Sequence, residues 1–140
     1  MKILKALILA FLCAACLVTN AQESEKSSKY IYPIIESDSA FQNAILSQKY
    51  VVVDFWAIWC RPCNLFSPEY EQIAKKFHKK AAFYKLNIDK CQATVIKYNT
   101  KIIPVIIIFK NGKEEKRYTG LTAKERIIFD LEEIIKKDKQ

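Results

Sequence analysis

The 140-residue sequence predicts one α/β domain, with a mixed central sheet that ends in a C-terminal antiparallel hairpin and carries helices on both faces. Three observations predict this fold class. The run 50–58 (YVVVDFWAI) is short and apolar on both faces, which is typical of a central parallel strand. Strand-like and helix-like patterns alternate around it, which favours parallel strands joined by crossover helices. The dipeptide Asn111-Gly112 separates two further strand-like runs and indicates a hairpin.

The first half of the chain supplies two helices and two strands. Ser37 or Asp38 can cap a first helix, which precedes the central strand at 50–58. A second helix is predicted over 61–78, because apolar residues recur there at helical spacing. Residues 81–89 (AAFYKLNID) form the second strand candidate.

The second half of the chain supplies a short helix, the hairpin and a terminal helix. The short helix is predicted over 92–98, and the two hairpin strands lie within 104–120. Thr122 and Glu125 have the spacing of a capping box that would start the last helix. The apolar face of that helix is formed by Ile127, Ile128, Leu131, Ile134 and Ile135.

The first 21 residues have the pattern of a secretory signal peptide. A basic start (MKILK) is followed by an apolar stretch and by small or polar residues that end at Ala21. Two alternatives are a retained anchor helix and lipid attachment at Cys16, although Cys13 stands where lipoprotein signals usually carry Leu. We therefore expect an exported protein, periplasmic if the source is bacterial.

Three segments follow from this pattern. They are a signal peptide over 1–21, a flexible linker over 22–34 that begins with a polar, Ser-rich stretch, and a folded domain over 35–140. The chain is 51% hydrophobic, which is enough to form a core that needs no stabilising disulfide bonds. The formal charge is +8, but the lysines are scattered and form no basic stripe, so we expect no nucleic-acid partner.

Cys60 and Cys63 are the candidate redox pair, at the junction between the central strand and the following helix. The helix N-terminus and the Arg61 cation both favour a thiolate at Cys60, so Cys60 is the expected nucleophile and Cys63 the resolving thiol. Pro62 suits the first helical turn, where its missing N–H costs nothing. A stapling disulfide would close too small a loop to stabilise the fold much.

A zinc site is the other interpretation of this pair. It would need two more ligands, and Cys91 and His78 lack the paired spacing of such sites. We therefore expect neither a metal nor a cofactor. If cleavage follows Ala21, Cys91 is the unpaired third thiol, and a small buried residue is the favoured interpretation over a regulatory one.

The segment VDFWAIWCRPC (53–63) resembles the active-site strand and motif of the thioredoxin family. The resemblance covers roughly residues 35–137 and implies the thioredoxin fold. It extends to Pro68, KLNID (85–89), IIP (102–104), KNG (110–112) and Gly120.

The resemblance implies roles for single residues. Asp54 matches the family's buried acid, which relays a proton to or from Cys63, and Lys85 matches the lysine near that acid. The alternatives are a structural core carboxylate and a solvated lysine. Pro104 matches a cis-proline that faces the two cysteines and leaves backbone groups free for a substrate.

Substrate contacts are expected around this pair. Trp59, Trp56 and Ile103 should form an apolar rim around Cys60, although Trp56 is equally explained as a core residue. The expected substrate-binding residues are Trp59, Arg61, Pro62, Ile103 and Pro104.

The sequence also departs from the family pattern. Arg61 stands where thioredoxins typically carry Gly, and Asn64 where they carry Lys; Ile102 and Val105 replace a common Gly and Thr. By stabilising the Cys60 thiolate, Arg61 should make the disulfide a better oxidant. The direction of electron flow is therefore left open.

The most economical interpretation is a monomeric, exported thiol-disulfide oxidoreductase that reduces or isomerises disulfides of protein substrates through Cys60 and Cys63. Its electrons would come from a membrane-linked thiol donor, and it would contact the membrane only if lipidated at Cys16. The alternatives are a disulfide-forming oxidase of the same fold and a non-catalytic peptide-binding module.

Overall fold

The computed structural model describes residues 28–139. The expected signal peptide, Cys16 and the first residues of the linker lie outside this part of the chain. Within it, none of the helices combines the length and the apolar character needed to cross a membrane.

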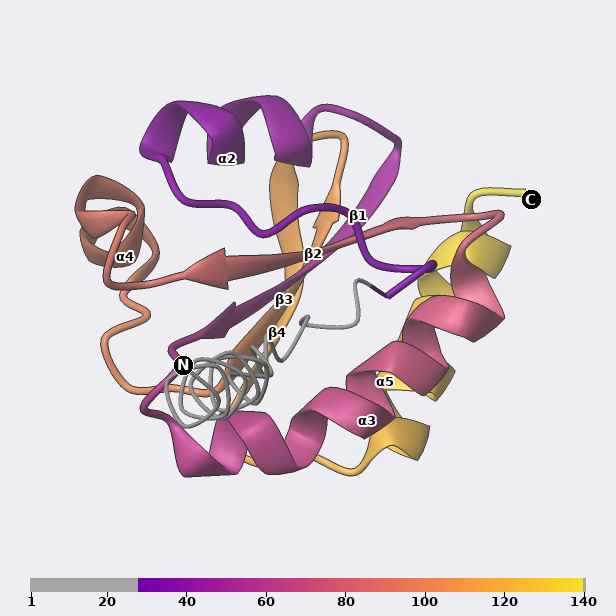
Figure 1. Ribbon diagram of the computed structural model, residues 1–140. Helices are drawn as coiled ribbons and strands as arrows, with labels where there is room; N and C mark the ends of the chain where they lie inside the picture. The colour runs from indigo at the N-terminus through magenta and orange to yellow at the C-terminus, as the bar shows by residue number, and fades with distance from the viewer. Residues whose placement is uncertain (1–27, 140) are drawn as a thin grey trace, which may run out of the picture.

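A four-stranded mixed sheet forms the centre of the domain, in the order β2-β1-β3-β4 (Figure 1). The strands are β1 (Tyr50–Trp56), β2 (Ala82–Asn87), β3 (Val105–Lys110) and β4 (Lys113–Thr119). β1 pairs parallel with β2 and antiparallel with β3, and β3 pairs antiparallel with β4. The predicted mixed sheet with its C-terminal hairpin is therefore confirmed.

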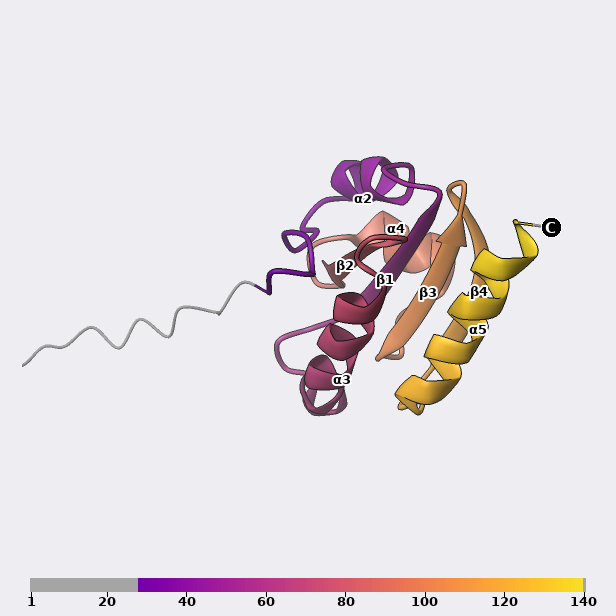
Figure 2. The same ribbon diagram turned by 90° about the vertical axis from the view of Figure 1, so that its right-hand side faces the viewer.

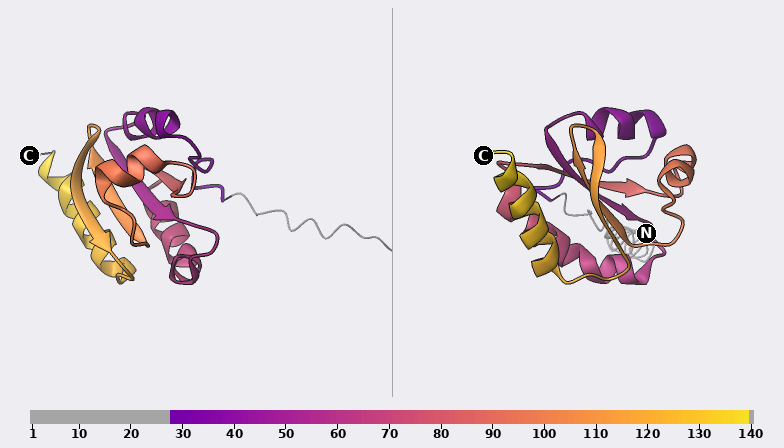
Figure 3. Two further views of the ribbon diagram at one scale, coloured as in Figure 1. Left: turned by 90° about the vertical axis from the view of Figure 1, so that its left-hand side faces the viewer. Right: turned by 180° about the vertical axis from the view of Figure 1, so that it is seen from behind.

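Two helices cover each face of the sheet. α2 (Asp38–Ile45) and α4 (Gln92–Tyr98) lie on one face, and α3 (Arg61–Phe77) and α5 (Lys124–Lys137) lie on the other (Figures 2 and 3). Alternate residues of β1 enter two separate cores, Val51, Val53 and Phe55 beneath α2 and Val52 beneath α3. The run 50–56 is apolar on both sides because both sides are covered.

The hairpin turn has the geometry that its sequence indicated. Asn111 and Gly112 both have positive φ angles, 51° and 74°, as a two-residue turn of this kind requires. The turn therefore places β4 beside β3 without a longer connection.

The two predicted helix caps have different outcomes. Ser37 is the N-cap of α2, and its hydroxyl accepts a hydrogen bond from the Ala40 N–H at 3.2 Å. The prediction of a capping box at Thr122 and Glu125 is wrong, because the N-cap of α5 is Ala123 and no side chain caps that end. The start of the helix is shifted by one residue, which places Thr122 before the N-cap and takes Glu125 out of the third helical position.

The segment from Tyr32 to Ile35 runs along the outer edge of β2. The Tyr32 N–H donates to the Phe83 carbonyl at 2.9 Å, and the Ile35 N–H donates to the Lys85 carbonyl at 2.8 Å. Ile35 also forms an isolated parallel bridge with Leu86. The chain thus contacts the sheet three residues before the domain start expected at residue 35.

Candidate active site

Cys60 and Cys63 form a disulfide at the point where the loop after β1 enters α3. Their Cα atoms lie 5.3 Å apart and their sulfur atoms are joined at 2.00 Å. The end of a buried strand and the start of a helix hold the pair, as the sequence predicted.

Cys60 is the N-cap residue of α3, and its sulfur accepts a hydrogen bond from the Cys63 backbone N–H at 3.3 Å. A free backbone N–H of the first helical turn thus donates to this sulfur. Pro62 lies in the same turn, where no N–H is needed. The two cysteines differ little in burial in the disulfide form, since Cys60 is 4% exposed and Cys63 is 1% exposed.

Of the expected apolar rim, Trp59 is exposed and Ile103 is half-buried. Trp59 is 63% exposed, and its indole N–H donates to Asp89 Oδ2 at 2.9 Å. The peptide bond between Ile103 and Pro104 is cis, as the family resemblance implied. Ile103 packs against the core cluster that contains Cys60, and the large exposed apolar residues of this region also include Ile58, Leu65 and Ile102.

Trp56 does not belong to this rim. It is only 7% exposed and lies in the core at the end of β1. The Lys85 amine lies 4.2 Å from the centre of its ring. The interpretation of Trp56 as a core residue is therefore the correct one.

Asp54 is a fully buried carboxylate in the middle of β1. Neither of its carboxylate oxygens has a hydrogen-bond partner among the described residues. Burial raises the pKa of Asp54 to about 7, while the positive charge of Lys85 acts in the opposite direction. A carboxyl group with this pKa can gain or lose a proton near neutral pH.

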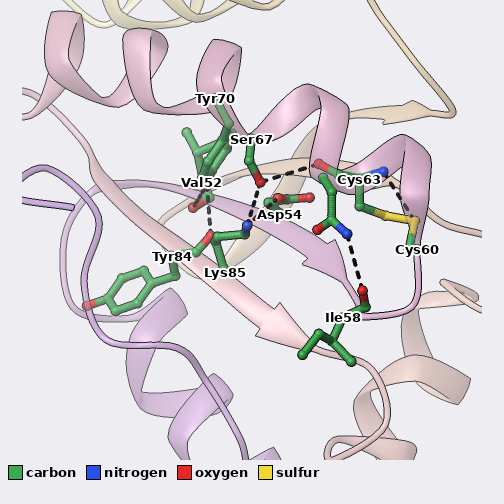
Figure 4. Close-up of polar contacts among 10 residues, drawn as sticks. Val52, Asp54, Ile58, Cys60, Cys63, Ser67, Tyr70, Tyr84 and Lys85 are labelled. Carbon is green, nitrogen blue, oxygen red and sulfur yellow. Dashed lines mark hydrogen bonds and ion pairs between the residues drawn. A yellow bond between two sulfur atoms is a disulfide. The ribbon is translucent and has the colours of Figure 1, made fainter. Parts of the chain in front are cut away.

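Lys85 lies opposite Asp54 in the parallel pair of strands β1 and β2. Its amine nitrogen is 3.9 Å from Asp54 Oδ2 and donates a hydrogen bond to Ser67 Oγ at 2.8 Å. Ser67, one turn after Cys63 in α3, donates in turn to the Cys63 carbonyl at 3.3 Å (Figure 4). The side chain of Lys85 is only 15% exposed, which excludes the alternative of a solvated lysine.

A groove of about 660 Å³ opens beside this network. The segment 28–36 forms one wall, Ser67 and Glu71 of α3 lie in the other, and Trp56 and Lys85 also line it. The sequence indicated neither the groove nor Ser67. Residues 28–34 were expected to belong to a linker, and the contact between Ser67 and Lys85 depends on how α3 lies over β2.

The remaining candidates do not join the site. Cys91 is fully buried, its thiol lies 3.8 Å from the Ile35 carbonyl oxygen, and burial raises its pKa to about 11. His78 is at the exposed end of α3, with a ring nitrogen 2.8 Å from the Lys75 carbonyl. Arg61 is exposed and forms no ion pair within residues 28–139.

Metal binding is the other chemistry that a pair of cysteines can support. In the described part of the chain, no group of three or more His, Cys, Asp or Glu residues is placed to hold a metal ion. The geometry of the pair is instead that of two thiols able to form and break a disulfide.

Comparison with known proteins identifies relatives over most of the chain. The sequence model of the family described as "Thioredoxin" matches residues 33–133. A thioredoxin of Mycoplasma genitalium is 40% identical over 94 residues, which cover 67% of this chain and 91% of the relative. A thioredoxin of Alicyclobacillus acidocaldarius is 36% identical over 99 residues, 71% of this chain and 94% of the relative.

A third relative, the chloroplastic M-type thioredoxin of spinach, is 36% identical over 100 residues. That match covers 71% of this chain but only 55% of the spinach protein.

Solved structures give the same result for the fold. A Plasmodium falciparum thioredoxin superimposes with a TM-score of 0.63 at 29% identity, covering 76% of this chain and 98% of that one. A mutant thioredoxin from Halobacterium salinarum superimposes with a TM-score of 0.68 at 23% identity, covering 76% of this chain and 93% of that one. The second likeness concerns the fold alone.

Proposed function

Because the chain belongs to the thioredoxin family of thiol-disulfide oxidoreductases, we propose that it reduces or isomerises disulfide bonds of exported proteins through Cys60 and Cys63. The observation that carries the proposal is Asp54, a buried carboxylate without a hydrogen-bond partner among the described residues, in the strand that leads to the two cysteines. Such burial costs folding free energy, and a role in proton exchange at the resolving thiol explains why the group is there.

The first chemical step is the attack of the Cys60 thiolate on one sulfur of a substrate disulfide. A bond forms between Cys60 and that sulfur, the substrate disulfide breaks, and the other substrate sulfur leaves as a thiolate and takes up a proton. The helix N-terminus and the Cys63 N–H stabilise the attacking thiolate.

The second step is the attack of Cys63 on the Cys60 sulfur. Cys63 gives up its proton, with Asp54 as the acceptor, and the mixed disulfide breaks. The second substrate thiol leaves, and the chain is left with the Cys60–Cys63 disulfide, having passed two electrons to the substrate. When another thiolate of the same substrate first attacks the substrate sulfur of the mixed disulfide, a new substrate disulfide forms and Cys60 leaves as a thiolate, so the substrate disulfide is rearranged without net transfer of electrons.

A new cycle requires a dithiol donor that reduces the Cys60–Cys63 disulfide. For an exported protein this donor would be linked to the membrane, since cytosolic reductants do not reach that compartment. The export pattern of residues 1–21 supports this part of the proposal. We further propose that the chain acts as a monomer.

Net oxidation of substrates is the second candidate function, and Arg61 is the observation that favours it. Its cation follows Cys60 directly, is exposed, and is neutralised by no carboxylate among the described residues. A cation beside the thiolate stabilises the reduced form and makes the disulfide more oxidising. The reduction potential, measured by equilibration with glutathione, separates the two directions.

Insulin reduction with dithiothreitol tests the activity itself. The wild-type protein should accelerate the reduction, Cys60→Ser and Cys63→Ser should abolish turnover, and Cys91→Ser should retain it as the matched control. A wild-type protein that gives no acceleration would leave a peptide-binding module as the function. Fractionation of cells that express the full chain, with Cys16→Ser beside it, tests export and lipidation.

A further inference from the structure

We propose that Ser67 is a positioning residue for this reaction: its hydroxyl holds the Lys85 ammonium beside Asp54 and thereby controls proton exchange between Asp54 and Cys63. The inference rests on the proposed role of Asp54. It adds a residue of α3 that neither the motif nor the sequence pattern singled out.

Of the two polar partners of the Lys85 amine, Ser67 rather than Asp54 holds it, and the Trp56 ring, with its centre 4.2 Å away, contacts it as well. The distance from the amine to Ser67 Oγ is 2.8 Å, a hydrogen bond, whereas its distance to Asp54 Oδ2 is 3.9 Å, too long for one. The Ser67 hydroxyl donates to the Cys63 carbonyl oxygen, 3.3 Å from its own oxygen, which leaves the Ser67 lone pairs free to accept from Lys85 (Figure 4).

The groove that Lys85 and Ser67 both line offers the ammonium alternative positions farther from Asp54. Glu71 of α3 and Glu36 of the N-terminal segment line this groove together with Lys85. Both carboxylates and solvent attract a cation that lies at the end of four rotatable bonds. The hydrogen bond to Ser67 therefore keeps the ammonium on the side of Asp54, against this outward attraction.

Few other groups can compensate for the loss of Lys85. From α3, Tyr70 lies beneath the same strand, but its hydroxyl donates to the carbonyls of Val52 and Tyr84 and carries no charge at neutral pH. From β3, the residue opposite Asp54 is the apolar Ile106. Lys85 is the one described group whose charge lowers the pKa of Asp54, which burial raises.

Loss of the Ser67 hydroxyl should therefore raise the pKa of Asp54. A cation within about 4–6 Å lowers a carboxyl pKa by about one unit or more, so moving it into the groove should reverse up to about one unit. From a pKa of about 7, such a rise leaves about a tenth rather than half of Asp54 ionised at pH 7. The attack of Cys63 on a mixed disulfide should then slow about five-fold at pH 7, and the deficit should shrink at higher pH as Asp54 ionises.

The test uses a matched pair of variants in protein purified after expression of the full chain. Ser67→Thr keeps the hydroxyl, and Ser67→Val introduces a side chain of the same shape as threonine but without the hydroxyl. Both are β-branched, so their cost to the helix is similar. The Asp54 carboxyl is titrated by NMR in the oxidised protein, where no thiol titrates at this pair.

The expected result is a wild-type titration in Ser67→Thr and a raised Asp54 pKa in Ser67→Val. In the Lys85→Met background, where no ammonium remains, the Ser67→Val change should no longer shift the Asp54 pKa. An unshifted or lowered pKa in Ser67→Val, or shifts that simply add in the double variant, would overturn the proposal.

This titration needs no substrate, so it separates the two proposals. A chain that fails to reduce insulin but shows the expected coupling would lose the proposed function and keep the positioning role of Ser67. A chain that reduces insulin but shows no effect of Ser67→Val on the Asp54 pKa would keep the proposed function and lose the positioning role of Ser67.

Discussion

The backbone N–H of Cys63 donates a hydrogen bond to the sulfur of Cys60, 3.3 Å away, at the first turn of α3. The two cysteines are thus unequal even though both are buried in the oxidised protein. When the disulfide is reduced, this donor and the helix N-terminus stabilise negative charge on Cys60, whereas Cys63 lies inside the turn and receives no such contact.

In the reduced protein, iodoacetamide should alkylate Cys60 at neutral pH about tenfold faster than Cys63, because its thiolate fraction is larger. Mass spectrometry of peptides over time gives both rates. Cys91 serves as the internal control: it is fully buried with a pKa raised to about 11, so it should stay unlabelled until the protein unfolds. Equal rates for Cys60 and Cys63 would refute the assignment of the nucleophile.

The free energy of unfolding should fall as the pH rises from about 4 to about 7. The pKa of Asp54 is raised in the folded state from its ordinary 3.8 to about 7, so the folded protein favours the protonated form. Its stabilising contribution is fully present below the unfolded pKa and is lost as the pH passes the folded pKa, on the order of 4 kcal/mol in total.

Asp54→Asn should remove this contribution to the pH dependence and exceed the wild type in stability at pH 8. Urea unfolding of the oxidised proteins at several pH values measures the difference. A variant that is less stable than the wild type at pH 8 would show that the ionised carboxylate has a compensating partner.

Arg61→Gly should lower the reduction potential. Loss of the cation removes about 1 kcal/mol of thiolate stabilisation at this exposed site, and ~1.4 kcal/mol corresponds to about 30 mV for two electrons, so the shift should be a few tens of millivolts at most. Equilibration with glutathione at low ionic strength measures it.

Arg61→Lys, which keeps the charge, is the matched control and should stay near the wild-type potential. High salt should shrink the difference between wild type and Arg61→Gly. A potential that stays constant or rises in Arg61→Gly would assign Arg61 to contact with a partner rather than to the thiolate.

Gly112→Ala and Gly120→Ala should each lower the free energy of unfolding by about 1 kcal/mol, because both positions have positive φ angles, 74° and 79°. Their surroundings differ: a Cβ at residue 112 would come within 2.6 Å of Leu46 Cδ2, whereas no atom lies within 4 Å of one at residue 120. Leu46 is 69% exposed and free to move, so the clash should add little. Chemical unfolding of both variants, alone and with Leu46→Ala, checks this, and a much larger loss at residue 112 that Leu46→Ala relieves would contradict it.

Much of the fold could be predicted because its signals are local. The apolar run of β1, the Asn111-Gly112 turn and the helical spacing after Cys63 each depend on a few neighbouring residues, and the structure contains all three. The predicted start of α5 was wrong for the same reason. A capping-box spacing was present at Thr122, but the helix begins at Lys124 after an N-cap without a side-chain contact.

The part of the site that could not be predicted depends on distant residues. Ser67 is a single polar residue between Phe66 and Pro68 of α3, and its partner Lys85 follows 18 residues later on β2. Nothing in the spacing of these two residues indicates a contact, which arises only when α3 lies across the parallel pair β1–β2. The catalytic roles of Asp54 and Lys85 stay predictions, whereas their proximity is a structural fact.

The N-terminal segment that runs along β2 also covers one outer border of the sheet. A sheet has two outer strands, and a bare outer strand offers its backbone N–H and C=O groups to any other chain that can add to it. Here the segment at Tyr32 and Ile35 occupies these groups on β2. At the opposite border, β4 carries the charged sequence KEEKR (113–117), which repels an incoming apolar strand. Both borders are thus protected against aggregation, one by hydrogen bonds already made within the chain and the other by charge.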